Sequence, residues 1–413
     1  MLQVPRLGVR GMAVVLLAVG AVVAVRSAVG SDFVDLSVYE AGGRAVLRGL
    51  PLYRATGDNG LPFTYPPFAA LLFVPLTLAG PTAPLLMVIS SIAALARIAV
   101  LLGRELSVAW DLDPFAGTAG LLGLVLMSEP VTASLSFGQV NALVLWLVVE
   151  AFAVRRAGAP WLIGLASAIK LTPLAFVPLM GARRPRDGVS SVLAFTLTVA
   201  LGWWVQPSEA ARYWSALVVD AGRVGGISYV GNQSINGMLW RLAGPGGVPW
   251  AWALCCLVVG LVCYAVGIRA LGRGEWILAA GSVGLFSLLA SPISWSHHWV
   301  GVTPVLVALC LRRSRVSTLL AFAGVVVLTS RVIWRIPSSS GLHHEHDVWQ
   351  FLGGNAYVLF GLVVVAHLGW SLRGTDVRQV LRRWARPRAA TTRSEPLVGV
   401  ESAEPAQHGE GLP

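Results

Sequence analysis

Residues 11–25 read Gly-Met-Ala-Val-Val-Leu-Leu-Ala-Val-Gly-Ala-Val-Val-Ala-Val, a stretch with no charged or hydrogen-bonding side chain. Strongly apolar runs recur at residues 140–154, 251–266, 318–328 and 357–367. Each run is close to the length that crosses a lipid bilayer, or forms the centre of a longer span. The sequence therefore predicts an all-α integral membrane protein.

The composition agrees with this class. The chain has 413 residues, of which 55% are hydrophobic and 12% charged, whereas about a quarter of a soluble domain is charged. The first apolar run follows Arg6 and Arg10 like a secretory signal, but further spans follow it, so it is interpreted as a span. We expect one membrane domain over residues 1–385. The Ala-, Thr-, Glu- and Pro-rich residues 386–413 are expected to form a disordered cytoplasmic tail.

The net charge of +11 indicates membrane orientation rather than nucleic-acid binding, because the arginines lie between apolar runs and in the tail. Arginine-rich segments remain in the cytoplasm. These segments contain Arg6 and Arg10; Arg183, Arg184 and Arg186; Arg269 and Arg273; Arg312, Arg313 and Arg315; and the tail from Arg373. We therefore expect a multi-pass plasma-membrane protein with both termini in the cytoplasm, and with residues 31–67, 206–248, 291–298 and 336–351 on the extracytoplasmic side.

The middle of the chain does not fit simple alternation of single crossings. Arg155 and Arg156 also indicate the cytoplasm, yet only about 26 residues separate Arg156 from Arg183, too few for two full spans. A helical hairpin broken at residues 170–173 reconciles the two ends, because Pro173 interrupts a helix. Broken helices of this kind line polar cavities. The expected total is 11 to 13 transmembrane helices.

The first outward loop begins Ser-Asp-Phe-Val-Asp-Leu-Ser-Val-Tyr-Glu at residues 31–40. On a helix, Asp32, Asp35 and Tyr39 share one face. An amphipathic helix lying on the membrane would hold a carboxylate over a cavity mouth, where a lipid-linked substrate presents its headgroup. Asp35 is then a candidate general base, and Asp32 and Tyr39 are candidates for binding the substrate. In the alternative interpretation Asp32 caps the helix and Asp35 only favours its dipole.

Four further residues are candidates for binding a sugar or a phosphate. Tyr65, in a proline-rich turn, can stack on a sugar, or belongs to an interfacial aromatic belt. Gln139 and Asn141 suit sugar hydroxyls because amides both donate and accept, or they join helices. Lys170, the only lysine, is a candidate phosphate ligand inside an apolar run. Its alternative role is a lysine whose ammonium reaches the interface.

Two outward loops are also rich in polar groups. Residues 228–241 offer amides for a sugar and an arginine for a phosphate, namely Asn232, Gln233, Asn236 and Arg241. His297 and His298 stand at the outward end of a span, where either imidazole can hydrogen-bond a phosphate oxygen or belong to an interfacial belt.

No metal site, cofactor or disulfide is predicted. The cluster His343-His344-Glu345-His346-Asp347 is too tight to converge on one ion without a turn and has no second cluster to match it. The four cysteines, Cys255, Cys256, Cys263 and Cys310, lie in apolar runs, where a thiol behaves as a small hydrophobe.

Five motifs, taken together in their order along the chain, resemble those of a known enzyme family. They are Asp-Leu-Ser-Val-Tyr at 35–39, Leu-Pro-Phe-Thr-Tyr-Pro-Pro at 61–67, Gly-Gln-Val-Asn at 138–141, Ala-Ile-Lys-Leu-Thr-Pro at 168–173 and Gly-Asn-Gln-Ser-Ile-Asn-Gly at 231–237. Together they resemble the actinobacterial polyprenyl-phosphate-mannose-dependent α-1,2-mannosyltransferases, which are glycosyltransferase family 87 enzymes with the GT-C fold. The resemblance runs from about residue 32 to the last span.

The resemblance implies an inverting transfer with Asp35 as the base, although Asp32 stays an alternative. It implies a polyprenyl-phosphate-linked sugar as donor and a mannoside or glycolipid as acceptor, both in the lipid bilayer. The residues leave two other functions open. One is a transferase that uses a polyprenyl-linked arabinose or glucose, and the other is a lipid-sugar transporter, which would not need Asp35. We find no repeat of the inverted kind that many transporters have.

Overall fold

The computed structural model describes residues 6–154, 156, 158–244, 248–336 and 347–372. Within these ranges the chain is helical and contains no β-strand, only two isolated bridges. The described residues form one compact unit. The expected tail, residues 386–413, lies outside the described residues.

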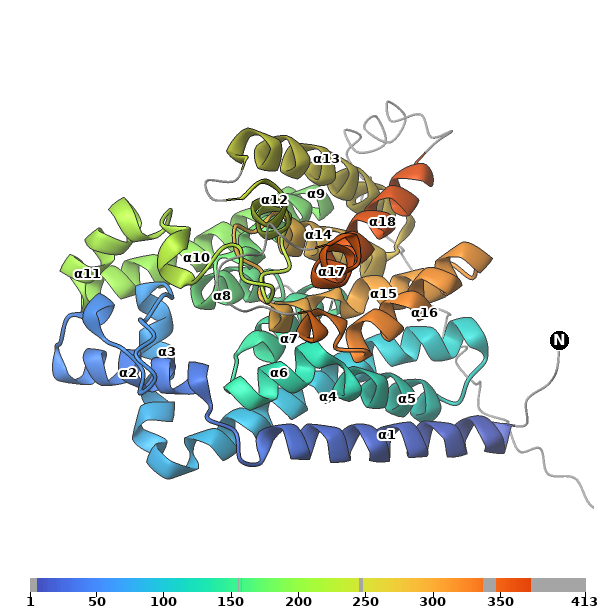
Figure 1. Cartoon of the computed structure of the whole chain (residues 1–413), viewed down its shortest axis with the longest axis horizontal. Coiled ribbons are helices and arrows are strands. Elements are labelled where there is room, and N and C mark those ends of the chain that lie inside the picture. The colour runs from blue at the N-terminus through green and yellow to red at the C-terminus, as the bar shows by residue number, and fades with distance from the viewer. Residues whose placement is uncertain (1–5, 155, 157, 245–247, 337–346, 373–413) are drawn as a thin grey trace, which may run out of the picture. The chain divides into compact units, whose positions relative to one another are not determined.

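The helices follow one another with short connections, and Figure 1 shows their arrangement. The first half contains α1 (Arg6–Ala28), α2 (Val34–Arg48), η1 (Leu52–Arg54), α3 (Pro67–Ala79), η2 (Gly80–Thr82), α4 (Ala83–Trp110), α5 (Pro114–Met127), α6 (Glu129–Phe137), α7 (Asn141–Ala153), α8 (Trp161–Ile169), η3 (Thr172–Phe176), α9 (Val177–Arg183) and α10 (Pro185–Val205). The second half contains α11 (Pro207–Arg212), η4 (Tyr213–Leu217), η5 (Ala221–Val224), α12 (Ile235–Ala243), α13 (Pro249–Arg273), α14 (Trp276–Ala290), η6 (Ser296–Val302), α15 (Thr303–Leu311), α16 (Arg315–Thr329), η7 (Val332–Arg335), α17 (Val348–Gly354) and α18 (Ala356–Trp370).

Several of these helices are able to cross a membrane, so the all-α, multi-pass architecture is confirmed. Four helical segments are long and apolar enough by themselves, and six if the bent pairs α5–α6 (68°) and α17–α18 (75°) each count as one span. One of the four, Pro67–Trp110, has 44 residues, about twice the length that one crossing needs. Four shorter apolar helices exist besides. The number of 11 to 13 spans stays a prediction.

Helices α1 and α5 pack side by side along one edge of the bundle (Figure 1). Their backbones approach so closely that a Cβ on Gly20 would lie 2.5 Å from the carbonyl oxygen of Gly123. Small residues at such crossings are typical of membrane helix pairs, which associate through close packing rather than hydrophobic burial.

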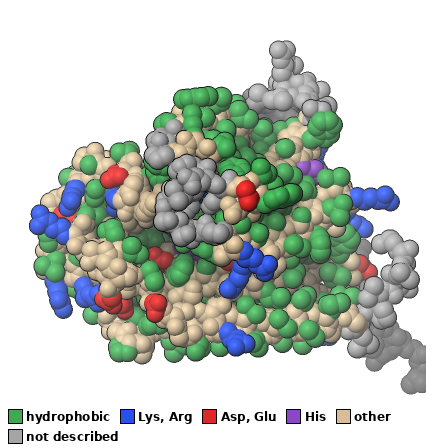
Figure 2. Space-filling model, in the orientation of Figure 1, with side chains coloured by type: hydrophobic (Ala, Val, Ile, Leu, Met, Phe, Trp, Pro, Cys, Tyr) green, Lys and Arg blue, Asp and Glu red, His purple; other side chains and the backbone are tan. Residues whose placement is uncertain are grey.

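The outer surface is apolar where lipid tails are expected. Large hydrophobic side chains are exposed on α1, α10, α13 and α16, for example Met12 (66%), Trp204 (82%), Leu261 (64%) and Phe322 (67%). Hydrophobic side chains cover much of the face in Figure 2. A soluble protein rarely exposes apolar surface on this scale, which indicates that a bilayer covers it.

The broken hairpin is confirmed. Helix α8 ends at Ile169, Lys170 is extended, and the chain returns through η3 and α9. Both ends of this hairpin lie together, because Arg183 donates a hydrogen bond to the carbonyl oxygen of Ala151 (3.1 Å) and shares a surface hollow with Arg156. The two arginine-rich segments are therefore on the same side, as the positive-inside rule requires.

Candidate active site

Asp35 lies half-buried in the first turn of α2. The helix begins only at Val34, because Phe33 adopts a left-handed conformation (φ 45°, ψ 47°) that turns the chain into the helix. Asp32 therefore lies outside the helix and is exposed. The prediction that Asp32 shares a helical face with Asp35 is wrong, and so is the alternative that Asp32 caps the helix, since no side chain caps α2.

A glycine brings α2 onto the turn between α6 and α7. Gly138 ends α6 with φ 67°, and a Cβ at this position would lie 2.8 Å from the Cβ of Leu36. The next residue, Gln139, forms a side-chain hydrogen bond with Asp35. Burial raises the pKa of Asp35 above its ordinary value, whereas this hydrogen bond and the positive charge of Lys170 lower the pKa.

Two tyrosines orient the Gln139 amide. The hydroxyl of Tyr39 donates to Gln139 Oε1 (2.9 Å) and lies 3.0 Å from the hydroxyl of Tyr65. Tyr39 is fully buried and stacks on Phe73 with ring centroids 4.2 Å apart. Because Gln139 Oε1 accepts from Tyr39, its NH₂ group is the one that faces Asp35. The structure thus brings Asp35, Tyr39, Tyr65 and Gln139 together.

Lys170 lies on the other side of the same turn. The break after α8 frees its side chain from the helix, and Nζ lies 2.8 Å from Asn141 Oδ1 and 2.8 Å from His298 Nε2. Nζ also lies 5.9 Å from the ring centroid of Tyr65. Among the described residues Nζ has these two hydrogen-bond partners, and an ammonium has three donors, so one remains for a ligand. Asp35, Lys170 and His298 are hereafter the charged cluster.

The two histidines start η6, and their rings are nearly perpendicular with centroids 4.8 Å apart. His298 Nε2 lies 2.8 Å from Lys170 Nζ, and its Nδ1 lies 3.2 Å from the backbone nitrogen of Trp295. A neutral imidazole accepts at only one nitrogen, and beside an ammonium that nitrogen is Nε2. His297 is buried, and its Nε2 has no hydrogen-bond partner among the described residues. The Asn141 amide donates to the backbone carbonyl of His297 (3.1 Å) and so connects the α6–α7 turn to η6.

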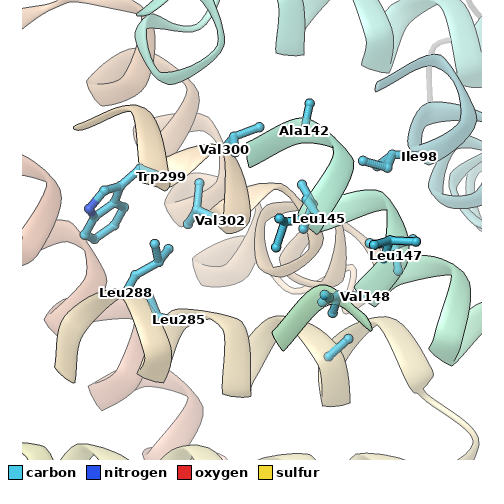
Figure 3. Close-up of a cluster of buried hydrophobic side chains, with 14 of the residues drawn as sticks. Ile98, Ala142, Leu145, Leu147, Val148, Leu285, Leu288, Trp299, Val300 and Val302 are labelled. Atoms are coloured by element: carbon cyan, nitrogen blue, oxygen red, sulfur yellow. The ribbon is translucent and has the colours of Figure 1, made fainter. Parts of the chain in front are cut away.

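A cavity of about 80 Å³ opens beside Lys170. Its polar side includes Asn141, Lys170, Ser294 and His298, and its remaining wall is mostly apolar. Figure 3 shows part of this apolar wall, including Leu145, Val148, Leu288 and Val300. Lys170 and His298 therefore lie where polar side chains meet an apolar wall.

The amides of the 228–241 loop do not reach this cavity's lining. Asn232 and Gln233 are fully buried, and their side chains bond mainly to backbone groups: Asn232 Oδ1 accepts from the N–H of Ser294 (2.9 Å), and Gln233 Nε2 donates to Val230 and Gly354 (both 2.7 Å). Asn236 Nδ2 donates to the carbonyl of Pro292 (3.2 Å). These contacts fasten loops to one another.

Arg241 is also occupied by protein groups. It is 1% exposed, and its guanidinium donates to Asn355 Oδ1 (2.6 and 3.0 Å) and to the carbonyls of Ser228, Tyr229 and Asn232 (3.0–3.3 Å). Its five N–H donors are thus all used. Asn232, Gln233, Arg241 and Asn355 are hereafter the loop brace.

One buried acid was missed by the sequence analysis. Glu129, the first residue of α6, is 2% exposed and accepts three hydrogen bonds from different segments. The available signal was a carboxylate between apolar runs, directly before Pro130, since an ionisable residue inside a membrane domain is usually functional.

In the histidine-rich cluster, residues 343–346 lie outside the described residues. Its last member, Asp347, caps α17 by accepting from the N–H of Gln350 (2.8 Å). In the described ranges no group of three or more His, Cys, Asp or Glu side chains is placed to hold a metal ion. All four cysteines are free.

Within a helical domain that has membrane-spanning helices, a broken helix brings Lys170 to His298, and the charge of Lys170 acts on the Asp35 carboxyl. Comparison with known families specifies the class. Glycosyltransferase family 87 matches residues 63–292, and the chain belongs to this family. It is therefore a membrane glycosyltransferase.

The chain is similar over most of its length to characterised mycobacterial proteins. A polyprenol-phosphate-mannose-dependent α-(1-2)-phosphatidylinositol mannoside mannosyltransferase of Mycolicibacterium smegmatis is 34% identical over 378 residues, covering 81% of this chain and 83% of the relative. Its namesake from Mycobacterium tuberculosis is 32% identical, covering 84% and 88%. A phosphatidylinositol pentamannoside mannosyltransferase of Mycobacterium tuberculosis is 34% identical, covering 83% and 81%. No solved structure matches the chain.

Proposed function

We propose that this chain transfers mannose from a polyprenyl-phosphate-mannose donor to a mannoside or glycolipid acceptor, forming an α-1,2 linkage with inversion at the extracytoplasmic face of the plasma membrane. The observation that carries this proposal is the charged cluster, in which a carboxylate and a lysine–histidine pair stand on either side of one turn. The relatives' names support mannose as the sugar and phosphatidylinositol mannosides as the acceptor class.

Asp35 is the proposed general base. Its carboxylate takes the proton from an acceptor hydroxyl while that oxygen attacks the anomeric carbon of the donor sugar. Gln139 orients this carboxylate through its NH₂ group, and the two tyrosines hold Gln139 in turn. A base must lie within hydrogen-bond reach of the proton that it removes, so this fixed placement is the useful feature.

Lys170 and His298 are the proposed ligands of the leaving group. As the bond between the anomeric carbon and the phosphate oxygen breaks, the electron pair stays with the polyprenyl phosphate and its negative charge grows. An ammonium with a free N–H donor stabilises this charge best in the transition state. The apolar wall beside Lys170 suits the lipid to which the phosphate is attached.

Tyr65 and Asn141 are the other residues proposed to contact the substrate. The loop brace is proposed to be structural. Tyr65 faces Lys170, and Asn141 holds both Lys170 and the start of η6. The proposed orientation is supported by the arginine-rich ends of the broken hairpin, which lie at the opposite end from Lys170. Both chain termini are accordingly proposed to be cytoplasmic.

The test is sugar transfer by the purified chain in liposomes, from polyprenyl-phosphate-mannose to a phosphatidylinositol mannoside, comparing Asp35→Asn with Asp32→Asn. Asp35→Asn is expected to lower kcat by about 100- to 10,000-fold, the range for loss of a general base. Asp32→Asn, which removes an exposed carboxylate three residues away, is the matched control and should retain transfer.

Equal losses in the two variants would reject Asp35 as the base. If the native chain binds the donor but transfers no mannose, offering polyprenyl-phosphate-arabinose or -glucose tests a different sugar. Movement of the intact donor across the liposome membrane, without transfer, would instead identify a transporter.

A further inference from the structure

We propose that Glu129 is a positioning residue for this reaction, because its buried carboxylate holds η6 where His298 meets Lys170. The inference rests on the proposed function for its kinetic test. Figure 1 shows α6, whose first residue is Glu129, beside the centre of the bundle, and α6 packs directly on η6.

The carboxylate joins three segments that are far apart in the sequence. Oε1 accepts from the Ser296 hydroxyl in η6 (2.9 Å) and from Trp334 Nε1 in η7 (2.7 Å). Oε2 accepts from the Tyr357 hydroxyl in α18 (2.9 Å). An indole N–H only donates, so an acceptor oxygen such as that of Glu129 suits this place. The N-terminus of α6 also favours negative charge.

The position of Ser296 links this carboxylate to the charged cluster. Ser296 directly precedes His297 and His298 at the start of η6. The carbonyl of His297 accepts from Asn141 Nδ2 (3.1 Å) and from the Ser134 hydroxyl (3.2 Å), which lies in α6. The start of η6 is thus fastened to one end of α6 by Glu129, and further along by Ser134 and Asn141.

This fastening determines where the imidazole of His298 lies. Its Nε2 is 2.8 Å from Lys170 Nζ, a contact that a small shift of η6 would break. Misplacement of a reacting group by about 1 Å lowers a rate by about 100-fold. Glu129 therefore acts on the reaction through Ser296 and η6 without touching the substrate.

The experiment compares two variants that each remove one hydrogen bond to the same carboxylate. Ser296→Ala removes the bond to η6, and Tyr357→Phe removes the bond to α18. If Glu129 positions η6, Ser296→Ala lowers kcat/KM for mannose transfer by about 10- to 100-fold, while Tyr357→Phe stays within about threefold of the native chain. Equal effects, at equal folded fractions, would overturn the proposal.

A third variant separates positioning from a direct electrostatic role. In Glu129→Gln the amide oxygen can still accept from Ser296 and Trp334, and the NH₂ group can donate to the Tyr357 hydroxyl. This variant should retain activity better than Ser296→Ala. A larger loss in Glu129→Gln would mean that the negative charge itself matters for the reaction, which would overturn the positioning role.

A second measurement does not depend on transferase activity. Diethyl pyrocarbonate modifies accessible histidines, and mass spectrometry gives the rate of modification at His297 and His298. Both imidazoles should react slowly in the native chain and in Tyr357→Phe, and several-fold faster in Ser296→Ala. Unchanged rates in Ser296→Ala would overturn the inference, whether or not mannose is the transferred sugar.

Discussion

The charged cluster and the loop brace are both built from buried polar side chains, and both contain a cation held by an asparagine. They differ in where the hydrogen bonds of that cation go. Arg241 uses all five donors on Asn355 and on three backbone carbonyls. Lys170 has two partners among the described residues, both side chains, and it lines a cavity.

The difference supports the proposal that Arg241 is a structural cation and that Lys170 binds a ligand. A cation whose donors all bond to other protein groups stabilises the fold, and removing it leaves those acceptors without partners. A cation with a free donor beside a cavity can take a phosphate oxygen without breaking existing bonds. The comparison therefore supports the proposed roles, which are stability for the loop brace and chemistry for the charged cluster.

The largest expected effect comes from exchanging each cation for methionine. Lys170→Met should lower kcat by about 100- to 1,000-fold, as expected when a group that stabilises transition-state charge is lost, and leave the melting temperature nearly unchanged. Arg241→Met should destabilise the protein by about 2–4 kcal/mol, because buried acceptors are left unpaired. The measurements are mannose transfer and thermal unfolding in detergent.

The opposite result, with transfer lost in Arg241→Met and stability lost in Lys170→Met, would contradict these assignments. If Arg241→Met lost transfer while its unfolding temperature stayed native, Arg241 would belong to the phosphate site, as the sequence had suggested. Donor binding by each variant, measured at equal folded fraction, distinguishes lost affinity from lost folding.

A smaller effect is expected on the pH dependence of transfer. Gln139→Met removes the hydrogen bond that lowers the pKa of Asp35, so this pKa should rise further above its ordinary value. A base acts when it is deprotonated. The acid limb of the kcat/KM profile should therefore move to higher pH in the variant, and activity should be lost earlier as pH falls.

The control is Gln233→Met, which removes the corresponding amide from the loop brace. This variant should lower the unfolding temperature and leave the acid limb in place. An acid limb that does not move in Gln139→Met would show that Asp35 is not the group whose ionisation limits transfer.

Much of the charged cluster could be predicted from the sequence, because its signals are local. The spacing of the arginines required a break near Lys170, and Pro173 located it. Asp35 follows the first span in a loop rich in carboxylates, and α2 has the expected amphipathic character. Asp32 was misplaced because nothing in the sequence reveals that Phe33 adopts a left-handed conformation.

The loop brace and Glu129 could not be separated from ligand sites by sequence. Arg241 bonds to residues 9 to 114 positions away, and Glu129 to residues 167 to 228 positions away. Such partners depend on the tertiary fold rather than on local pattern. A polar motif in an outward loop therefore predicts burial and hydrogen bonding. Whether one of its hydrogen-bond donors remains available for a substrate depends on the partners that the tertiary fold brings to it.

The smallest expected effect comes from a comparison of two asparagines, Asn141 beside Lys170 and Asn236 in the 228–241 loop. Asn141→Ala removes the acceptor of Lys170 and the donor to the His297 carbonyl, so transfer should fall by roughly tenfold, equivalent to about 1.4 kcal/mol. Asn236→Ala removes one hydrogen bond to the Pro292 carbonyl and should change stability by about 1 kcal/mol, with transfer nearly native. If Asn236→Ala weakened acceptor binding instead, seen as a raised KM at native stability, the boundary between loop brace and substrate site would lie closer to residue 236 than the hydrogen bonds indicate.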